Sequence, residues 1–179
     1  MGLILLRHTT PDVASGICYG QTDLDVASSF PEEAETAFSK LRPFESIISS
    51  PLTRCRKLAD FIAAKTRLSV QIDHRLIEMD FGSWEGRAWS DISRVEIDAW
   101  ADDLLNARPH GGESVAMLRD RTLEALKDIL ERKIPKLVVT HSGVIKAALA
   151  KSDQTETFNT QIDFGGHVTI SELEGDEDE

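Results

Sequence analysis

Short apolar runs alternate along this chain with longer amphipathic stretches, and this alternation limits the possible fold more than any other feature. The apolar runs predict strands at residues 3–6, 46–49, 69–72, 137–140 and 167–173. The amphipathic stretches predict helices at residues 31–41, 53–66, 92–106, 114–132 and 142–151. Strands that alternate with helices favour an α/β domain, with a mostly parallel sheet and helices on both of its faces.

The length of 179 residues, 41% of them hydrophobic, fits one globular domain with a real core. We expect residues 1–173 to form this domain and residues 174–179, EGDEDE, to be a solvated acidic tail. No apolar run approaches the roughly 18 residues of a membrane span, and the first run is too short for a signal peptide. These features predict a cytoplasmic protein with no membrane partner.

Charge and cysteine content exclude further classes of function. The net charge of −11 argues against a surface for nucleic acid or anionic lipid. Cys18 and Cys55 are too few for a disulfide framework, and no Cys/His cluster has the spacing of a zinc site. We therefore expect no bound metal and no cofactor.

Charged and polar side chains follow three of the predicted strands, at the point where each strand ends. Arg7 and His8 follow the first, Arg54 comes shortly after the second, and His141 and Ser142 follow the fourth. In an open α/β sheet the active-site crevice lies beyond the carboxyl ends of the strands. Two histidines and two arginines are therefore expected to converge there.

Such a set of residues suits phosphoryl transfer. Arginine offers a rigid, permanently charged fork to phosphate oxygens, and a neutral imidazole is a competent nucleophile without a metal. The His-Ser-Gly turn opens a predicted helix, so its backbone N–H groups can face an anion. An acid must also protonate the departing alkoxide. Glu78, Asp80 and Glu85, in a loop rich in glycine and aromatic residues, are the candidates.

Four motifs, RHT, SSPLTRCRKLA, EMDFGSWEG and VVTHSG, stand in this order along the chain. Together they resemble the histidine phosphatase (phosphoglycerate mutase-like) superfamily. The stretch CYGQTDLDVA and the short length also resemble the alpha-ribazole phosphatase branch of that superfamily. The resemblance implies a three-layer α/β/α sandwich, whose sheet is mostly parallel with an antiparallel strand.

The resemblance also implies a role for each matching residue. His8 would be the nucleophile that becomes phosphohistidine, while Arg7, Arg54 and His141 would bind the phosphoryl oxygens. Glu78 matches the acid/base position. The small phosphorylated substrate implied is alpha-ribazole 5′-phosphate or another small phosphomonoester.

The chain departs from the family pattern near both histidines. Thr9 replaces the glycine that usually follows the nucleophile, so this loop must take an ordinary conformation or carry strain. Ser142 replaces a glycine after the second histidine and can serve as a helix cap or an extra donor. Thr9 and Ser142 thus join the expected phosphate-binding residues. Pro11 and Asp12 stand where the family has other polar residues just after the nucleophile, and this change is expected to weaken phosphate binding.

Other interpretations stay open. A member of a phosphatase family can bind a phospho-ligand without turnover, and a two-histidine phosphoesterase would pair the His-x-Thr motifs that begin at His8 and His167. His110 and Glu113, in a Pro/Gly loop, either touch substrate or simply cap the next helix. Trp84 and Trp89 are expected to pack against other side chains, with stacking on the substrate as the alternative.

Overall fold

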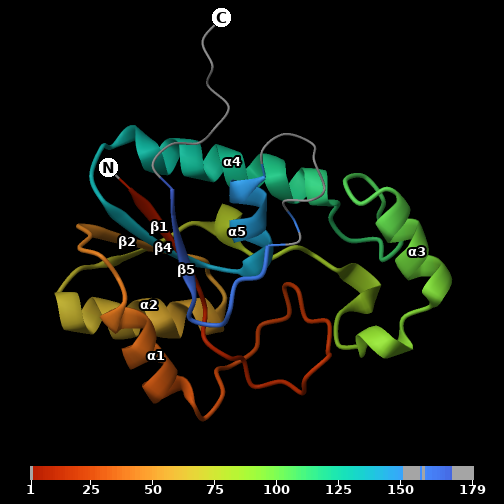
Figure 1. Ribbon diagram of the computed structural model, residues 1–179, viewed down its shortest axis with the longest axis horizontal. Coiled ribbons are helices and arrows are strands. Elements are labelled where there is room, and N and C mark those ends of the chain that lie inside the picture. The colour runs from red at the N-terminus through yellow and green to blue at the C-terminus, as the bar shows by residue number, and fades with distance from the viewer. Residues whose placement is uncertain (1, 151–157, 159, 171–179) are drawn as a thin grey trace, which may run out of the picture.

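The computed structural model describes residues 2–150, 158 and 160–170, and these form a five-stranded mixed sheet between helices (Figure 1). The strand order is β3–β2–β4–β1–β5, and every neighbouring pair is parallel except β1 and β5. The strands are β1 (Leu3–Arg7), β2 (Ser46–Ser49), β3 (Val70–Ile72), β4 (Lys136–Thr140) and β5 (His167–Ile170). The predicted mostly parallel sheet with an antiparallel strand is confirmed. Residues 151 and 171–173 of the predicted elements, and the acidic tail at 174–179, lie outside the described residues.

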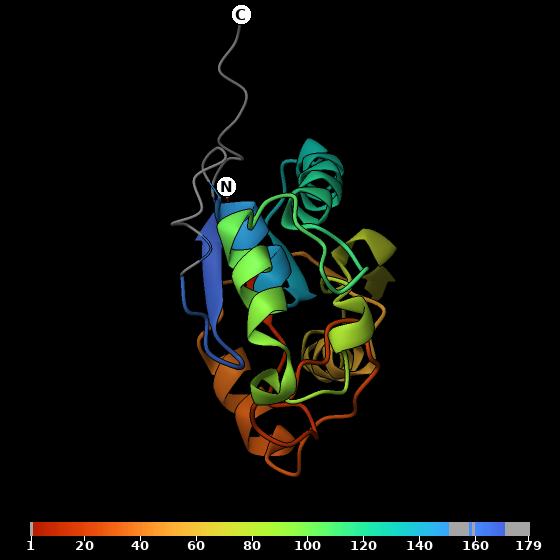
Figure 2. The same cartoon turned by 90° about the vertical axis from the view of Figure 1, so that its right-hand side faces the viewer.

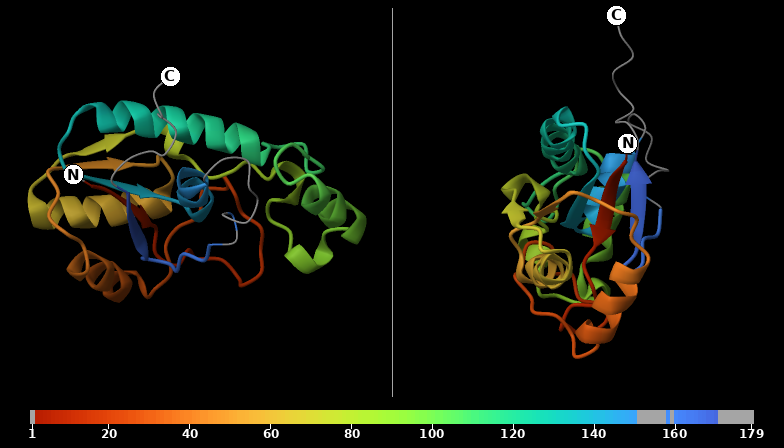
Figure 3. Two further views of the ribbon diagram at one scale, coloured as in Figure 1. Left: turned by 45° about the horizontal axis from the view of Figure 1, so that its top comes forward. Right: turned by 90° about the vertical axis from the view of Figure 1, so that its left-hand side faces the viewer.

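Two helices cover each face of this sheet, as Figure 3 shows from two sides. One face carries α1 (Phe30–Ser39) and α2 (Thr53–Thr66), and the other carries α4 (Val115–Glu131) and α5 (Ser142–Leu149). The side chains of β1 alternate between these layers. Leu3 and Leu5 pack against the α4 and α5 side, whereas Ile4 and Leu6 pack against α1 and α2. Burial on both faces explains why the central strands, β1 and β4, are continuous apolar runs in the sequence.

The register of the central strands brings their carboxyl ends together. Arg7 at the end of β1 pairs with Thr140 at the end of β4, and Ser49 at the end of β2 pairs with Val139. The residues that follow these strands therefore emerge side by side at one edge of the sheet, as expected for an α/β active site.

A smaller group of elements extends from one end of the molecule (Figure 1) and faces the viewer in Figure 2. It contains α3 (Arg94–Asp102) and the 3₁₀ turns Gly82–Trp84 and Trp89–Asp91; a further turn, His74–Leu76, lies beneath α4. The ring of Trp84 is fully buried and contacts the rings of Trp89, Trp100 and His110. Its predicted packing role is thus confirmed. Within the described part of the chain, no helix is long and apolar enough to cross a membrane.

Candidate active site

His8 lies directly after β1 and is only 1% exposed. Its Nδ1 atom is 2.7 Å from the carbonyl oxygen of Thr9. Because a carbonyl oxygen only accepts, Nδ1 carries the ring proton and Nε2 keeps its lone pair. Burial, together with the positive charges of Arg54 and Arg7, lowers the pKa of His8 to about 3, against the opposing effect of the Thr9 hydrogen bond. The imidazole is therefore neutral near pH 7 and can act as a nucleophile.

Arg54 is fully buried in the first turn of α2. Its Nη1 donates to the carbonyl oxygen of Thr22 at 2.8 Å and its Nη2 to that of Gly20 at 2.7 Å. These bonds leave the buried Nε atom without a hydrogen-bond partner among the described residues. A buried donor without an acceptor is energetically unfavourable, so an anion that reaches this N–H group gains a charge-assisted hydrogen bond.

Arg7 is held on the other side of the site. Its Nη1 donates to the carbonyl oxygen of Ile162 at 2.6 Å, and its guanidinium carbon lies 3.8 Å from the ring centre of Phe164. The Nε of Arg7, like that of Arg54, is buried and has no partner in the described part of the chain. Both guanidinium groups are therefore fixed in place by the protein and keep a free donor.

His141 follows β4 and occupies the N-cap position of α5. Its ring centre is 5.2 Å from that of His8. Ser50 Oγ lies 2.8 Å from His141 Nε2, and the Sγ atom of Cys55 lies 3.5 Å from the same nitrogen. Burial, and then the neighbouring His8 and Arg54, hold the pKa of His141 well below its usual range. The two rings thus form a dry, neutral pair, and a bound phosphate would favour a proton on His141.

Glu78 lies against the first turn of α5. Its Oε1 accepts from the backbone N–H of Met79 at 2.9 Å and its Oε2 from that of Gly143 at 3.1 Å. A Cβ atom at position 143 would lie 2.2 Å from Oε1, so a residue larger than glycine there would displace the Glu78 carboxylate. Gly143 is two residues after His141 in the chain, so this hydrogen bond ties the Glu78 carboxylate to the helix turn that follows His141.

The other two candidate carboxylates are bound by loop backbone. Asp80 Oδ1 accepts from the backbone N–H of Gly82 at 2.7 Å. Glu85 accepts from the backbone N–H groups of Gln21 at 2.9 Å and Thr22 at 2.8 Å. Glu85 therefore shapes the loop whose carbonyl groups hold Arg54. Of the three carboxylates, only Glu78 has a hydrogen bond to the helix that begins after His141.

Thr9 takes an ordinary backbone conformation. Among the described residues, Arg67 is the one non-glycine residue with a positive φ. The threonine that replaces the usual glycine thus carries no left-handed strain. Its Oγ1 atom is buried and without a partner in the described part of the chain. Pro11 forms an isolated bridge with Val26, which ties the loop after His8 to the segment before α1. Ser142 is the first residue of α5 and is half-buried; the cap position expected for it is occupied by His141.

A comparison with known families decides the affiliation. Residues 3–179 match the model described as Histidine phosphatase superfamily (branch 1). This chain belongs to that superfamily. It is 31% identical over 169 residues to the glucosyl-3-phosphoglycerate phosphatase of Mycolicibacterium vanbaalenii, an alignment that covers 83% of this chain and 72% of the relative. The metal-independent phosphoserine phosphatase of Arabidopsis thaliana is 29% identical over 167 residues, which cover 87% of this chain and 70% of that protein.

A solved structure agrees with this result. The putative alpha-ribazole-5′-P phosphatase from Escherichia coli str. K-12 has a TM-score of 0.84 and 26% sequence identity, and the match covers 95% of this chain and 89% of that one. The resemblance to histidine phosphatases, the phosphoglycerate mutase-like fold and the assignment as a phosphatase, a hydrolase, are confirmed. The names of these three proteins give three different substrates. Membership of the family therefore indicates a phosphatase but does not identify the leaving group.

The side chains of His110 and Glu113 both contact other parts of the protein. Nδ1 of His110 accepts from the backbone N–H of Gly112 at 3.0 Å, and the ring centre lies 4.8 Å from that of Trp84. Glu113 forms a bidentate ion pair with Arg121 of α4, at 2.7 and 2.9 Å. Among the described residues, the hydrogen bonds and ring contacts of these two side chains are thus with their own loop, with residues 80–84 and with α4.

Sequence reasoning missed two residues that support the segment of Glu78. Gln21 Nε2 donates to the carbonyl oxygen of Glu78 at 3.0 Å, and Arg121 donates to the same atom at 3.0 Å. Both lie on elements far from Glu78 in the sequence, and no local pattern marks them. No group of three or more His, Cys, Asp or Glu side chains is arranged to hold a metal ion in the part of the chain that the structure describes.

Proposed function

We propose that this histidine phosphatase hydrolyses small phosphomonoesters through a phosphohistidine at Nε2 of His8. The observation that carries the proposal is the neutral His8 ring, with Nδ1 bound to the Thr9 carbonyl, beside two fixed guanidinium groups. Arg7, Arg54 and His141 would bind the non-bridging oxygens. Thr9 Oγ1 and the N-terminal turn of α5 at Ser142 offer further donors.

Two displacements complete the reaction. Nε2 of His8 attacks phosphorus, the bond from phosphorus to the leaving oxygen breaks, and the protonated Glu78 carboxyl gives that oxygen its proton. The imidazolium of phosphohistidine is stabilised by its Nδ1–H bond to Thr9. Glu78, now a carboxylate, takes a proton from water as the water attacks phosphorus. The bond to Nε2 breaks, inorganic phosphate leaves, and His8 is neutral again.

The substrate we propose first is alpha-ribazole 5′-phosphate. Support comes from the CYGQTDLDVA stretch and from the similarity to the E. coli protein that carries this substrate in its name. Glucosyl-3-phosphoglycerate and phosphoserine, the substrates in the names of the two relatives, are the comparators. A panel of these three phosphomonoesters identifies the leaving group by kcat/KM.

Rapid quench with a radiolabelled phosphomonoester tests the mechanism. We expect an acid-labile, base-stable label on His8, and His8→Ala should retain less than about a thousandth of the wild-type rate. His167→Asn is the matched control. In β5, His167 lies opposite Leu6, whereas His141 is the ring next to His8. An equal loss in His167→Asn would instead favour the two-histidine phosphoesterase, and tight binding without label or turnover would favour a non-catalytic phospho-ligand-binding protein.

A further inference from the structure

The guanidinium group of Arg121 uses all five of its N–H donors. Nε donates to one carboxylate oxygen of Glu113 at 2.7 Å, and Nη2 to the other at 2.9 Å. Nη1 donates to the carbonyl oxygens of Arg75 and Ile77, both at 2.7 Å, and Nη2 also donates to that of Glu78 at 3.0 Å. The side chains of Arg121 and Glu113 are 18% and 12% exposed, so solvent weakens this network little.

The chain around Glu78 is not held by the hydrogen bonds of a helix or strand. Residues 77–81 belong to no helix or strand, so their backbone polar groups depend on partners outside a ladder. Glu113 supplies such partners beyond Glu78. Its backbone N–H donates to the carbonyl oxygen of Asp80 at 2.8 Å, and its Oε2 accepts from the backbone N–H of Asp80 at 3.3 Å. The ion pair therefore holds the backbone on both sides of Glu78.

We propose that the Glu113–Arg121 ion pair is a positioning clamp, which sets where the Glu78 carboxyl meets the leaving-group oxygen. The proposal rests on the proposed function, because it presumes that Glu78 is the proton donor. The Glu78 carboxylate has two hydrogen bonds of its own, to Met79 and Gly143. One of these partners, the Met79 N–H, lies on the same backbone segment as Glu78 itself. The position of the carboxylate therefore depends on where Arg121 and Glu113 fix that segment. Arg121 acts through that backbone and is a positioning residue.

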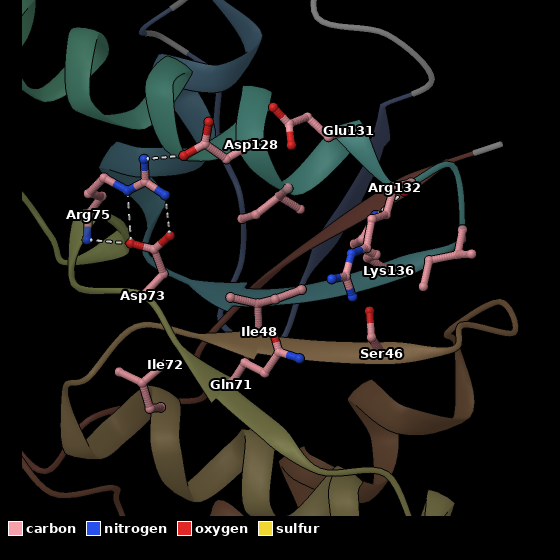
Figure 4. Close-up of a pocket in the computed structure, with 12 residues that line it drawn as sticks. Ser46, Ile48, Gln71, Ile72, Asp73, Arg75, Asp128, Glu131, Arg132 and Lys136 are labelled. Atoms are coloured by element: carbon pink, nitrogen blue, oxygen red, sulfur yellow. Dashed lines mark hydrogen bonds and ion pairs between the residues drawn. The ribbon is translucent and has the colours of Figure 1, made fainter.

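A second link between α4 and the same segment provides a matched control. The side chain of Arg75 binds Asp128 of α4 at 2.7 Å and Asp73 at 2.8 Å (Figure 4). Asp128 is 55% exposed, and its link reaches only the side chain of Arg75, three residues before Glu78. Asp128→Asn therefore loosens a contact between α4 and this segment but leaves every carbonyl bond of Arg121 in place.

The experiment compares an alkyl phosphate with p-nitrophenyl phosphate, whose leaving group needs little protonation. Arg121→Lys keeps the charge but has three donors in place of a five-donor fork, so kcat/KM for the alkyl phosphate should fall about 10- to 100-fold. The loss on p-nitrophenyl phosphate should be less than about threefold. Glu113→Gln should shift the ratio in the same direction, and Asp128→Asn should leave it unchanged. The fraction of folded enzyme cancels in this ratio, so partial unfolding does not obscure the result.

Equal losses on both substrates in Arg121→Lys and Glu113→Gln, or a lower Tm with an unchanged ratio, would overturn the clamp and leave the pair a purely structural role. If Arg121→Lys does not fold, the ratio in Glu113→Gln alone decides in the same way. The proposed function fails on a different measurement, the absence of label on His8 in the wild-type enzyme, which does not involve Arg121.

Discussion

Substitution of Gly143 by alanine should displace the Glu78 carboxylate without destabilising the fold, and it therefore tests whether activity depends on the position of this carboxylate. The new Cβ atom would lie 2.2 Å from Glu78 Oε1 and 3.1 Å from its Cδ. A methyl carbon and a carboxylate oxygen keep more than about 3 Å apart, so the carboxylate has to move by about 1 Å. A displacement of that size at a reacting group lowers the rate about 100-fold, which corresponds to about 2.7 kcal/mol.

The fold itself should tolerate the change. Gly143 lies in the first turn of α5 and has no positive φ. In a helix interior, replacement of glycine by alanine stabilises by up to about 1 kcal/mol, so the Tm of Gly143→Ala should be equal to or slightly above that of the wild type. A clash with the flexible end of a side chain is relieved by movement of that side chain and not of the backbone.

The assay is kcat/KM on an alkyl phosphate, with thermal unfolding of the same preparation. Glu78→Asp serves as the partner variant, because a carboxylate on a shorter side chain leaves room for the new methyl group. We expect the loss in the double variant to be smaller than the product of the two single losses, as for residues in contact. Wild-type activity in Gly143→Ala would refute the reasoning, since the carboxylate would then not be needed at its observed place.

Three further predictions concern titration, metals and the acid. The folded-state pKa of His8 is about 3, against 6.5 for a free imidazole. Below pH 6.5 the unfolded chain therefore binds a proton that the folded protein does not. The free energy of unfolding falls as a result when the pH is lowered towards 3. Denaturant titrations near pH 5 should show a pH slope about 1.4 kcal/mol per pH unit shallower in His8→Asn than in the wild type; identical slopes would contradict a neutral buried His8. Hydrolysis should continue in EDTA, because the arginines supply the positive charge, and a rate that vanishes there and returns with magnesium would refute the mechanism. Glu78→Gln should lose about 10²- to 10⁴-fold on an alkyl phosphate but show a burst of nitrophenol with p-nitrophenyl phosphate; equal losses and no burst would make Asp80 the next residue to test.

Much of the fold followed from periodicity, because the central strands and the helices α1, α2, α4 and α5 each bury apolar side chains. The helix predicted at residues 53–66 has these bounds in the structure. The helix predicted at 92–106 ends early, at Asp102. There the side chain of Asp103 accepts from the backbone and side-chain amides of Asn106, at 3.3 and 2.9 Å, in place of a helical turn. Short polar side chains compete in this way with helix continuation, and the apolar pattern does not register that competition.

The site was predictable where the topology alone determines it. Parallel strand ends meet at one edge, so His8 and His141 could be placed together from their positions after two apolar runs. The role of Glu113 could not be predicted. Its partner Arg121 lies on a helix whose rotation depends on core packing, and the carbonyl groups that Arg121 binds lie more than forty residues earlier in the chain. Such contacts leave no spacing signature in a sequence.

The place of β1 in the sheet has a consequence for biosynthesis. β1 lies between β4 and β5, and both of these partners come from the last quarter of the chain. The ribosome therefore releases the strand that leads to His8 long before β4 and β5, and that strand remains without these neighbours until synthesis has passed them. Pairing across so long a separation is slow, because closing the intervening loop is entropically unfavourable. Residues 3–6 are thus an apolar segment that the nascent chain exposes until β4 and β5 emerge, and His8 and His141 come together only after β4 has been made.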